Sequence, residues 1–421
     1  MTIIRSKSFH LEIVKLLIST GSLTSKLPNQ ERNTIYLDEI YHRYDSDQFE
    51  ESTSFSLETF NKLVNTIHKT IKKPKVPSAT NETWRKVWVA IRYLQGAKTS
   101  DLCLIAGIAF STCHKYIWEV YKTHFNFSNL FVFNLFFLHY LVLHQVIDAV
   151  NDLHCIKWPS RDGLLQIQQG WAEYGPFDKA IGAVDGTLIK IRHPLKRGSS
   201  RAFHVDRKAI AAINAQVVVD STTKILFLST EAAGATHDTA AFDIAGGELL
   251  EAEIDFVDGF FLGDGGYKQS KNMLIPIPNL KAPHPLADEE VKREYDRKKK
   301  FNYIHSSQRM TVERTFGILK SRFGILRSPL MVAFSHAPMI INAIFSIHNM
   351  LLDISDDYKI YCEEFEIEEV DLTHERPSDE DDSDDDYDEE DVVLIKTDVT
   401  TRQRIIQANV LRDFYINKIN L

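Results

Sequence analysis

The sequence predicts an α/β protein, in which helices pack on the faces of a mixed β-sheet and an all-helical region comes first. Three observations lead to this prediction. Apolar runs separated by turn residues recur with the period of strands between residues 180 and 275. Helical spacing of apolar residues precedes this stretch at 81–120 and follows it at 287–354.

The helical region at 81–121 contains three short apolar-periodic segments. Helix caps are available at Thr99 or Ser100 and at Ser111, and Gly107 separates the last two segments. Such an arrangement predicts a helix-turn-helix, in which Thr112, His114 and Lys115 begin the recognition helix and face a DNA groove. A small structural helical bundle is at least an equal alternative, because three-helix patterns are common and the third segment is not rich in Arg or Lys.

The central stretch predicts strands followed by helices. Residues 180–185 and 187–191 flank Gly186 as a hairpin, and residues 212–220 and 224–230 form a second hairpin. One helix is expected at 236–253, capped near Thr236 or Asp238, and an apolar strand at 259–267 ends in an acid and two glycines. One or two helices should follow at 287–324, another from Pro338, and a last one at 399–419.

Charge is distributed unevenly along the chain. The net charge of the 421 residues is −9, yet residues 361–391 contain 18 acids and one base, so removing their −17 leaves +8. The acidic segment 355–391 is predicted to be disordered. A basic body with an acidic tail indicates a polyanionic partner, and a solubilising tail explains it equally well. The four separated cysteines favour a reducing compartment over a zinc or disulfide framework.

Residues 125–147 form an unusual apolar stretch, rich in Phe, Leu and Asn. Its length fits a transmembrane helix, but three asparagines and two histidines interrupt it and no basic flank orients it. A buried helix and an insertion foreign to the fold are the alternatives. We expect no membrane association and interpret residues 122–147 as an anomalous insertion.

Three acids occupy unusual positions in these elements. Asp185 and Asp264 each end an apolar strand, and Glu313 lies on a helix beside a core stripe. Glycines and Lys320 share the face of Glu313, which predicts free space for a bulky partner. Acids at neighbouring strand ends repel one another unless a cation joins them, and two Mg²⁺ or Mn²⁺ ions are the expected cofactors. Taken singly, each acid is more readily explained as a turn residue or a helix N-cap, and the metal interpretation gains from the three acids together with the basic body. A phosphatase of the haloacid dehalogenase type is excluded, because its nucleophile position holds Ala183.

The chain resembles transposases of the PIF/Harbinger group and the Harbinger transposase-derived nucleases. The matching pieces run in order from about residue 156 to 350: IKWPS, IGAVDGTLIKI, INAQVVVD, GATHDTAAF, FLGDGGY and VERTFGILKSRF. The resemblance implies a ribonuclease-H-like fold, a metal-binding D-D-E triad of Asp185, Asp264 and Glu313, and nuclear localisation, with the cytoplasm as an alternative. It also implies DNA as substrate and a Myb/SANT-like partner protein. Ala209 and the Gly265-Gly266-Tyr267-Lys268 step depart from the family pattern without touching the triad.

The domain organisation follows from the resemblance and the composition. We expect an N-terminal region at 1–80, the helix-turn-helix-like domain at 81–121, the insertion at 122–147, the nuclease domain at 156–354, the acidic tail at 355–391 and a C-terminal helix at 392–421. His237 and Asp238 are expected to support the site, with Asp238 favoured as a helix N-cap. The oligomeric state is left open, with a dimer as one option. Phosphate contacts are expected from Arg192, Arg197, Arg201, Lys208, Arg314 and Lys320, for which solvated surface is the alternative.

Two functions fit the sequence. The first is a metal-dependent DNA endonuclease of transposase origin that hydrolyses phosphodiesters and, in a transposase, also transfers strands. The second is a catalytically inactive, domesticated protein that binds DNA or chromatin. The intact triad favours the first function, and the insertion and the acidic tail favour the second.

Overall fold

The structure is a computed structural model that describes part of the chain. The described residues are 41, 49–50, 53–70, 83–97, 102, 147–192, 211–330, 332, 336–365 and 399–419. The second and third helices of the predicted helix-turn-helix, the apolar stretch 122–146, residues 193–210 and residues 366–398 lie outside them.

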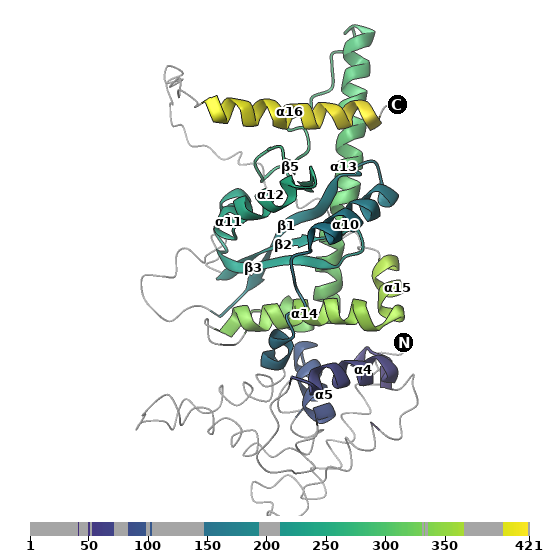
Figure 1. The fold of residues 1–421 in the computed structure, drawn as a ribbon, viewed down its shortest axis with the longest axis vertical. Coiled ribbons are helices and arrows are strands. Elements are labelled where there is room, and N and C mark those ends of the chain that lie inside the picture. The colour runs from purple at the N-terminus through teal and green to yellow at the C-terminus, as the bar shows by residue number, and fades with distance from the viewer. Residues whose placement is uncertain are drawn as a thin grey trace, which may run out of the picture.

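A five-stranded mixed sheet forms the centre of the molecule, in the order β3-β2-β1-β4-β5 (Figure 1). Strands β1, β2 and β3 pair antiparallel, whereas β4 pairs parallel with β1 and β5 pairs parallel with β4. This mixed arrangement is consistent with the ribonuclease-H-like fold that the resemblance implies. The strands are β1 (Ala180–Lys190), β2 (Ala212–Val219), β3 (Ile225–Ala233), β4 (Phe260–Leu262) and β5 (Met273–Leu274).

Helices cover both faces of the sheet, because each face carries apolar side chains that must leave water. Val184, Val218 and Phe261 pack against α11 and α12, whereas Ala183 and Val217 belong to the larger core that includes α13 and α14. The 34-residue helix α13 runs past the sheet from α16 towards α14 (Figure 1). The helices of this part are α10 (Arg161–Tyr174), α11 (Asp238–Ile244), α12 (Gly247–Asp255), α13 (Glu289–Arg322), α14 (Ala337–Ile354), α15 (Asp356–Glu364) and α16 (Val399–Ile419), with a short 3₁₀ turn, η3 (Gly324–Arg327).

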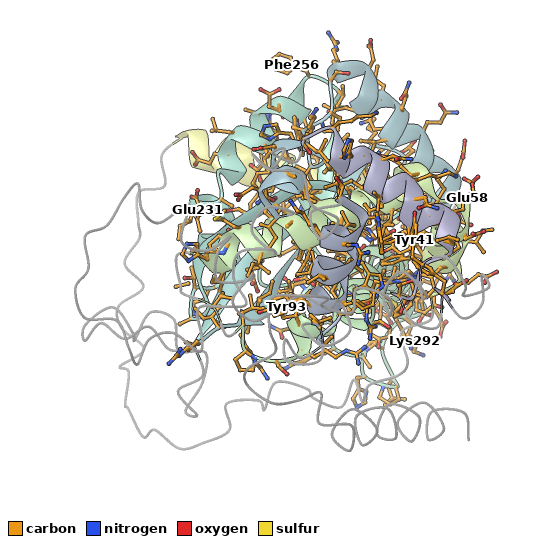
Figure 2. The ribbon with its side chains drawn as sticks, turned by 90° about the horizontal axis from the view of Figure 1, so that it is seen from below. Tyr41, Glu58, Tyr93, Glu231, Phe256 and Lys292 are labelled. Atoms are coloured by element: carbon orange, nitrogen blue, oxygen red, sulfur yellow. The ribbon has the colours of Figure 1, made fainter. Side chains whose placement is uncertain are left out.

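Two N-terminal helices pack beside η3 and α14. Helix α4 (Leu57–His68) begins at Ser56, whose hydroxyl accepts a hydrogen bond from the Thr59 amide, and it contacts α5 (Thr83–Leu94). Tyr41, labelled in Figure 2, stacks on Trp84 of α5 with 4.3 Å between ring centroids. Helix α5 confirms the first helix predicted in this region.

Three expectations about secondary structure are wrong. Residues 180–190 form one continuous strand, so Gly186 does not turn the chain. The helix expected at 236–253 is split into α11 and α12 at Gly246, whose φ of +88° is left-handed and ends the first helix. Residues 356–364, expected to be disordered, form helix α15, which Ser355 caps by accepting a hydrogen bond from the Tyr358 amide.

Helix α14 is long and apolar enough to span a membrane by composition alone. Thirteen of its eighteen residues are buried inside the protein, however. Its His348 and Asn349 also bond to the backbone of Thr223 and Ile225 at the β2–β3 hairpin. The helix is therefore a core element that supports the sheet.

Candidate active site

The first acid lies in the middle of the sheet. Asp185 belongs to β1 and pairs across the strands with Val217 of β2, whose side chain packs in the core on the α13 side. Because side chains opposite one another in a pair share a face, Asp185 faces helix α13. The Gly186 amide donates a hydrogen bond to Asp185 Oδ1 at 2.8 Å, which fixes one carboxylate oxygen.

The second acid reaches the same level through parallel strand pairing. Leu262 of β4 pairs with Ala183 of β1, so Asp264, two residues further along, comes level with Asp185. The Gly266 amide donates to Asp264 Oδ1 at 2.8 Å, which holds the carboxylate in a tight turn. Parallel pairing of β1 with β4 thus brings two acids far apart in sequence to the same level, although β1 continues to Lys190 and only β4 ends there.

The third acid comes from helix α13. Its core stripe is buried as the sequence predicts, with Val312, Leu319 and Phe323 at most 1% exposed. Glu313, one position beyond Val312, is consequently held half-buried at the edge of the helix–sheet interface. The structure thus places the three acids of the predicted triad, from β1, the turn after β4, and α13, within electrostatic reach of one another.

Arg309 joins two of these acids directly. Its Nη1 donates to Asp185 Oδ2 at 3.1 Å, and its Nη2 donates to Glu313 Oε1. Sequence reasoning missed this residue, although a signal was present: Arg309 precedes Glu313 by four residues and therefore lies on the same helix face.

The electrostatics of the cluster show an excess of negative charge. The pKa of Asp185 is raised to about 7 as the net result of opposing effects: burial raises it most, Arg309 and the Gly186 amide lower it, and Asp264 and Glu313 raise it. Burial lowers the pKa of Arg309, but the three acids outweigh burial and the net shift is upward. A carboxyl with such a raised pKa lacks sufficient compensating positive charge.

A fourth acid, Asp238, lies beside the cluster. A Cβ placed on Gly266 would be 2.7 Å from Asp238 Oδ2 and 3.1 Å from Asp264 Oδ1, so both carboxylates border the same glycine. The interpretation of Asp238 as an N-cap is wrong: the N-cap position of α11 is His237, and no side chain caps this helix. The side chain of His237 is exposed.

A buried polar chain supports the turn that carries Asp264. The Tyr267 hydroxyl donates to Gln216 Oε1 at 2.7 Å, and Gln216 donates to Asn214 Oδ1 at 3.0 Å. Position 186 of β1 is a glycine because a Cβ there would lie only 2.6 Å from both Asn214 Oδ1 and Gln216 Nε2. The glycine thus makes room for polar side chains, which is why a turn was wrongly expected at this position.

The small residues on the Glu313 face of α13 do not leave free space. A Cβ on Gly317 would lie 2.9 Å from Phe365 Cε1, and one on Gly324 would lie 2.6 Å from the Gln95 carbonyl oxygen. Neighbouring parts of this chain therefore pack against both glycines. The expectation of free space for a bulky partner is wrong at Gly317 and Gly324.

The predicted phosphate-contacting residues are only partly described. Lys320 is half-buried on α13; burial lowers its pKa and Asp185 partly opposes this shift, so the ammonium lies within electrostatic reach of the site. Arg314 is half-buried and Arg192 is exposed, and the Arg192 amide donates to the Leu330 carbonyl. Residues outside the described part are Thr112, His114, Lys115, Arg197, Arg201 and Lys208.

The donor set fits a hard divalent cation by its chemistry. Carboxylate oxygens are the ligands that Mg²⁺ and Mn²⁺ prefer, and the raised pKa of Asp185 marks a site short of positive charge. The spacing differs from that of a formed metal centre, since no three acidic, His or Cys side chains in the described ranges are grouped closely enough to hold one ion. The guanidinium of Arg309 lies between two of the three acids instead.

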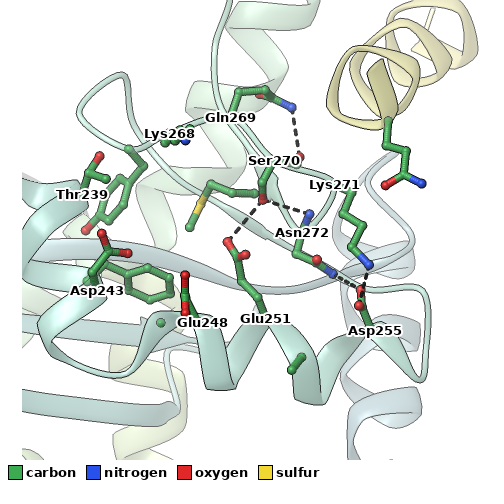
Figure 3. A pocket seen from close by; sticks show the side chains of 16 residues that line it. Thr239, Asp243, Glu248, Glu251, Asp255, Lys268, Gln269, Ser270, Lys271 and Asn272 are labelled. Carbon is green, nitrogen blue, oxygen red and sulfur yellow. Dashed lines mark hydrogen bonds and ion pairs between the residues drawn. The ribbon is translucent and has the colours of Figure 1, made fainter. Parts of the chain in front are cut away.

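A cavity of about 590 Å³ lies next to this cluster, between α12 and the chain that follows Asp264. Glu248 and Glu251 project towards it from α12, opposite Ser270 and Asn272 (Figure 3). None of the triad residues lines it, but its wall is the same turn, because Thr239 donates to the Gly266 carbonyl at 2.7 Å.

Comparisons with known proteins give one match. Residues 184–349 match the family model described as DDE superfamily endonuclease, a range that contains Asp185, Asp264 and Glu313. No curated protein and no solved structure matched the chain. The match supports a DDE transposase-type family for the part of the chain that builds the sheet and carries the acids.

Proposed function

We propose that this protein is a divalent-metal-dependent DNA endonuclease of transposase origin. Its active site, formed by Asp185, Asp264 and Glu313, hydrolyses phosphodiester bonds of DNA. The observation that carries the proposal is the convergence of these acids from three separate elements, inside the range that matches an endonuclease family. The more specific PIF/Harbinger assignment belongs to the same proposal and rests on the ordered motifs of the sequence.

The three acids would hold the ions through their carboxylate oxygens. When bound, two divalent cations activate a water molecule and stabilise the leaving oxygen of the phosphodiester. The chain prepares this chemistry by fixing one oxygen of Asp185 and one oxygen of Asp264 with the Gly186 and Gly266 amides, while Arg309 bonds the second oxygen of Asp185. Partial burial of the cluster strengthens every charge interaction within it.

Contacts with the DNA backbone are assigned to basic residues around the acids. Lys320 and Arg314 lie on the helix that carries Glu313, and Arg192 follows β1. Such contacts would be independent of base sequence and sensitive to salt. Asp238 is proposed to support Asp264 from across Gly266, and His237 to stand at the start of the same helix.

Strand transfer, nuclear localisation and a Myb/SANT-like partner complete the proposal. They follow from the family resemblance, and the basic body of the chain is compatible with them. A freed 3′-hydroxyl would attack target DNA at the same acids in strand transfer, so one site would serve both steps.

The test is cleavage of supercoiled plasmid DNA with Mg²⁺ or Mn²⁺ by the wild type, Asp185→Asn and Asp353→Asn. Asp353 is an exposed acid of α14 that pairs with Lys224, and its variant is the control for loss of one negative charge. We expect cleavage by the wild type and the control and at least a hundredfold less by Asp185→Asn. Equal cleavage by all three would contradict the proposed site. DNA binding without cleavage by the wild type would favour the non-catalytic DNA-binding function.

A further inference from the structure

The guanidinium of Arg309 bridges acids from two different elements. One nitrogen bonds to Asp185 on β1 and another to Glu313 on α13, so both carboxylates are directed at the same planar cation. The Arg309 side chain is only 14% exposed, against 18% for Asp185 and 33% for Glu313. The bridge therefore holds the helix face against the strand at the position where the negative charge concentrates.

The charge balance explains why a cation occupies this position. Three carboxylates converge here, and two of them raise the pKa of the third. All three in turn raise the pKa of Arg309. Carboxylates this close repel one another unless positive charge separates them, and Arg309 supplies it in the described structure.

The same position is the one that a divalent cation would need. Asp185 and Glu313 cannot give the bonded oxygens to a metal ion while both are held by the guanidinium. Arg309 sits on a long side chain, and its neighbours Gln308 and Val312 are buried and fix the backbone of α13. Exchange of the guanidinium would therefore use rotation about its side-chain bonds and not movement of the helix.

We propose that Arg309 is an exchangeable counter-ion of the acidic cluster, which pairs Asp185 with Glu313 in the absence of divalent metal and is displaced when metal binds. The inference rests on the proposed function, because it takes the acids as metal ligands. It assigns Arg309 the role of a counter-ion: the residue compensates the charge of Asp185 and Glu313 before metal arrives and competes with the metal for their oxygens.

The opposing interpretation is that Arg309 forms a permanent structural ion pair. The two interpretations predict opposite changes in metal affinity when Arg309 is removed. If Arg309 competes with metal, its removal strengthens metal binding. If Arg309 is a fixed support of the site, its removal weakens metal binding because the acids move apart.

The experiment measures Mn²⁺ binding to the full chain by isothermal titration calorimetry, without DNA, for the wild type and three variants. Arg309→Gln removes the cation, and Arg309→Lys keeps the charge but loses the planar group that reaches two acids. Arg297→Gln is the control, because Arg297 lies on the same helix, is half-exposed and pairs with Glu294 away from the cluster.

We expect Arg309→Gln to bind Mn²⁺ about tenfold more tightly than the wild type, which corresponds to about 1.4 kcal/mol. Arg309→Lys should fall between the two, and it keeps the test valid if the Gln variant does not fold. Arg297→Gln should match the wild type. Thermal melting should show a lower midpoint for Arg309→Gln without metal and a larger rise of the midpoint on adding Mn²⁺.

If both Arg309 variants bind Mn²⁺ as weakly as the wild type or more weakly, the proposed exchange is overturned. Mn²⁺ binding by the wild type would still leave the proposed function standing. Absence of Mn²⁺ binding in all four proteins would overturn both. Plasmid cleavage by the wild type, measured in parallel, distinguishes failure of the exchange alone from failure of the proposed function.

Discussion

Replacing Asp185 by Asn should make the protein more stable while it removes the proposed activity. Asn has nearly the same shape as Asp but cannot ionise, so the substitution isolates the effect of the charge. The wild-type side chain is 18% exposed, and burial is the largest cause of the rise in its pKa from 3.8 to about 7. Keeping this carboxyl ionised in such surroundings lowers the free energy of unfolding.

The size of this effect follows from the two pKa values. The carboxyl titrates near 3.8 in the unfolded chain and near 7 in the folded protein, so the folded state holds the extra proton between these values. The contribution of Asp185 to stability is therefore complete below about pH 4 and is lost as pH rises to about 7. At about 1.4 kcal/mol per pH unit, the loss amounts to about 4 kcal/mol. Loss of the charge-assisted Arg309 bond in the variant offsets part of this gain, and we expect about 2–4 kcal/mol at pH 8.

The assay is urea unfolding followed by tryptophan fluorescence, from pH 5 to pH 8.5 in EDTA, for the wild type, Asp185→Asn and the control Asp353→Asn. The free-energy difference between Asp185→Asn and wild type should grow with pH up to about pH 7 and then remain constant. The control should run parallel to the wild type. A difference that is constant with pH, or one that shrinks as pH rises, would refute the reasoning.

Three further perturbations test the surroundings of the site. Gly186→Ala should cost about 1–3 kcal/mol and reduce cleavage, because its Cβ would lie 2.6 Å from two polar side chains; an unchanged urea midpoint would contradict this. His305 and His348 are buried with their pKa lowered to about 4, so each should lose roughly 3 kcal/mol of stability as pH falls from about 6.5 to 4, and the urea midpoint should fall steeply below pH 6.5. His348→Gln should flatten that fall, and a profile identical to wild type would exclude this cause. Tyr415→Phe removes a 2.8 Å bond to Asp178 and should lower stability by about 1–3 kcal/mol in calorimetry; an unchanged melting temperature would show that the bond does not help to hold α16 in place.

The triad could be named from the sequence because each acid interrupts a strong local pattern. Asp185 and Asp264 end apolar runs, and Glu313 stands beside a stripe whose core side was predicted correctly. The second hairpin, helix α13 and helix α14 were predictable for the same reason, since periodicity is a local property. Local pattern failed at Gly186, where a glycine that makes room for neighbouring side chains was taken for a turn.

The sequence by itself determined the residue types at the site: three acids, their glycines and a basic body around an acidic segment. Only the tertiary structure decided which residues meet, since contact between β1 and β4 depends on parallel pairing across some eighty residues of chain. It also decided that Arg309, not empty space, lies between Asp185 and Glu313, and that Phe365 covers Gly317. The physical reason is that periodicity records which face of an element is buried, whereas the side chain across that face belongs to a distant part of the chain.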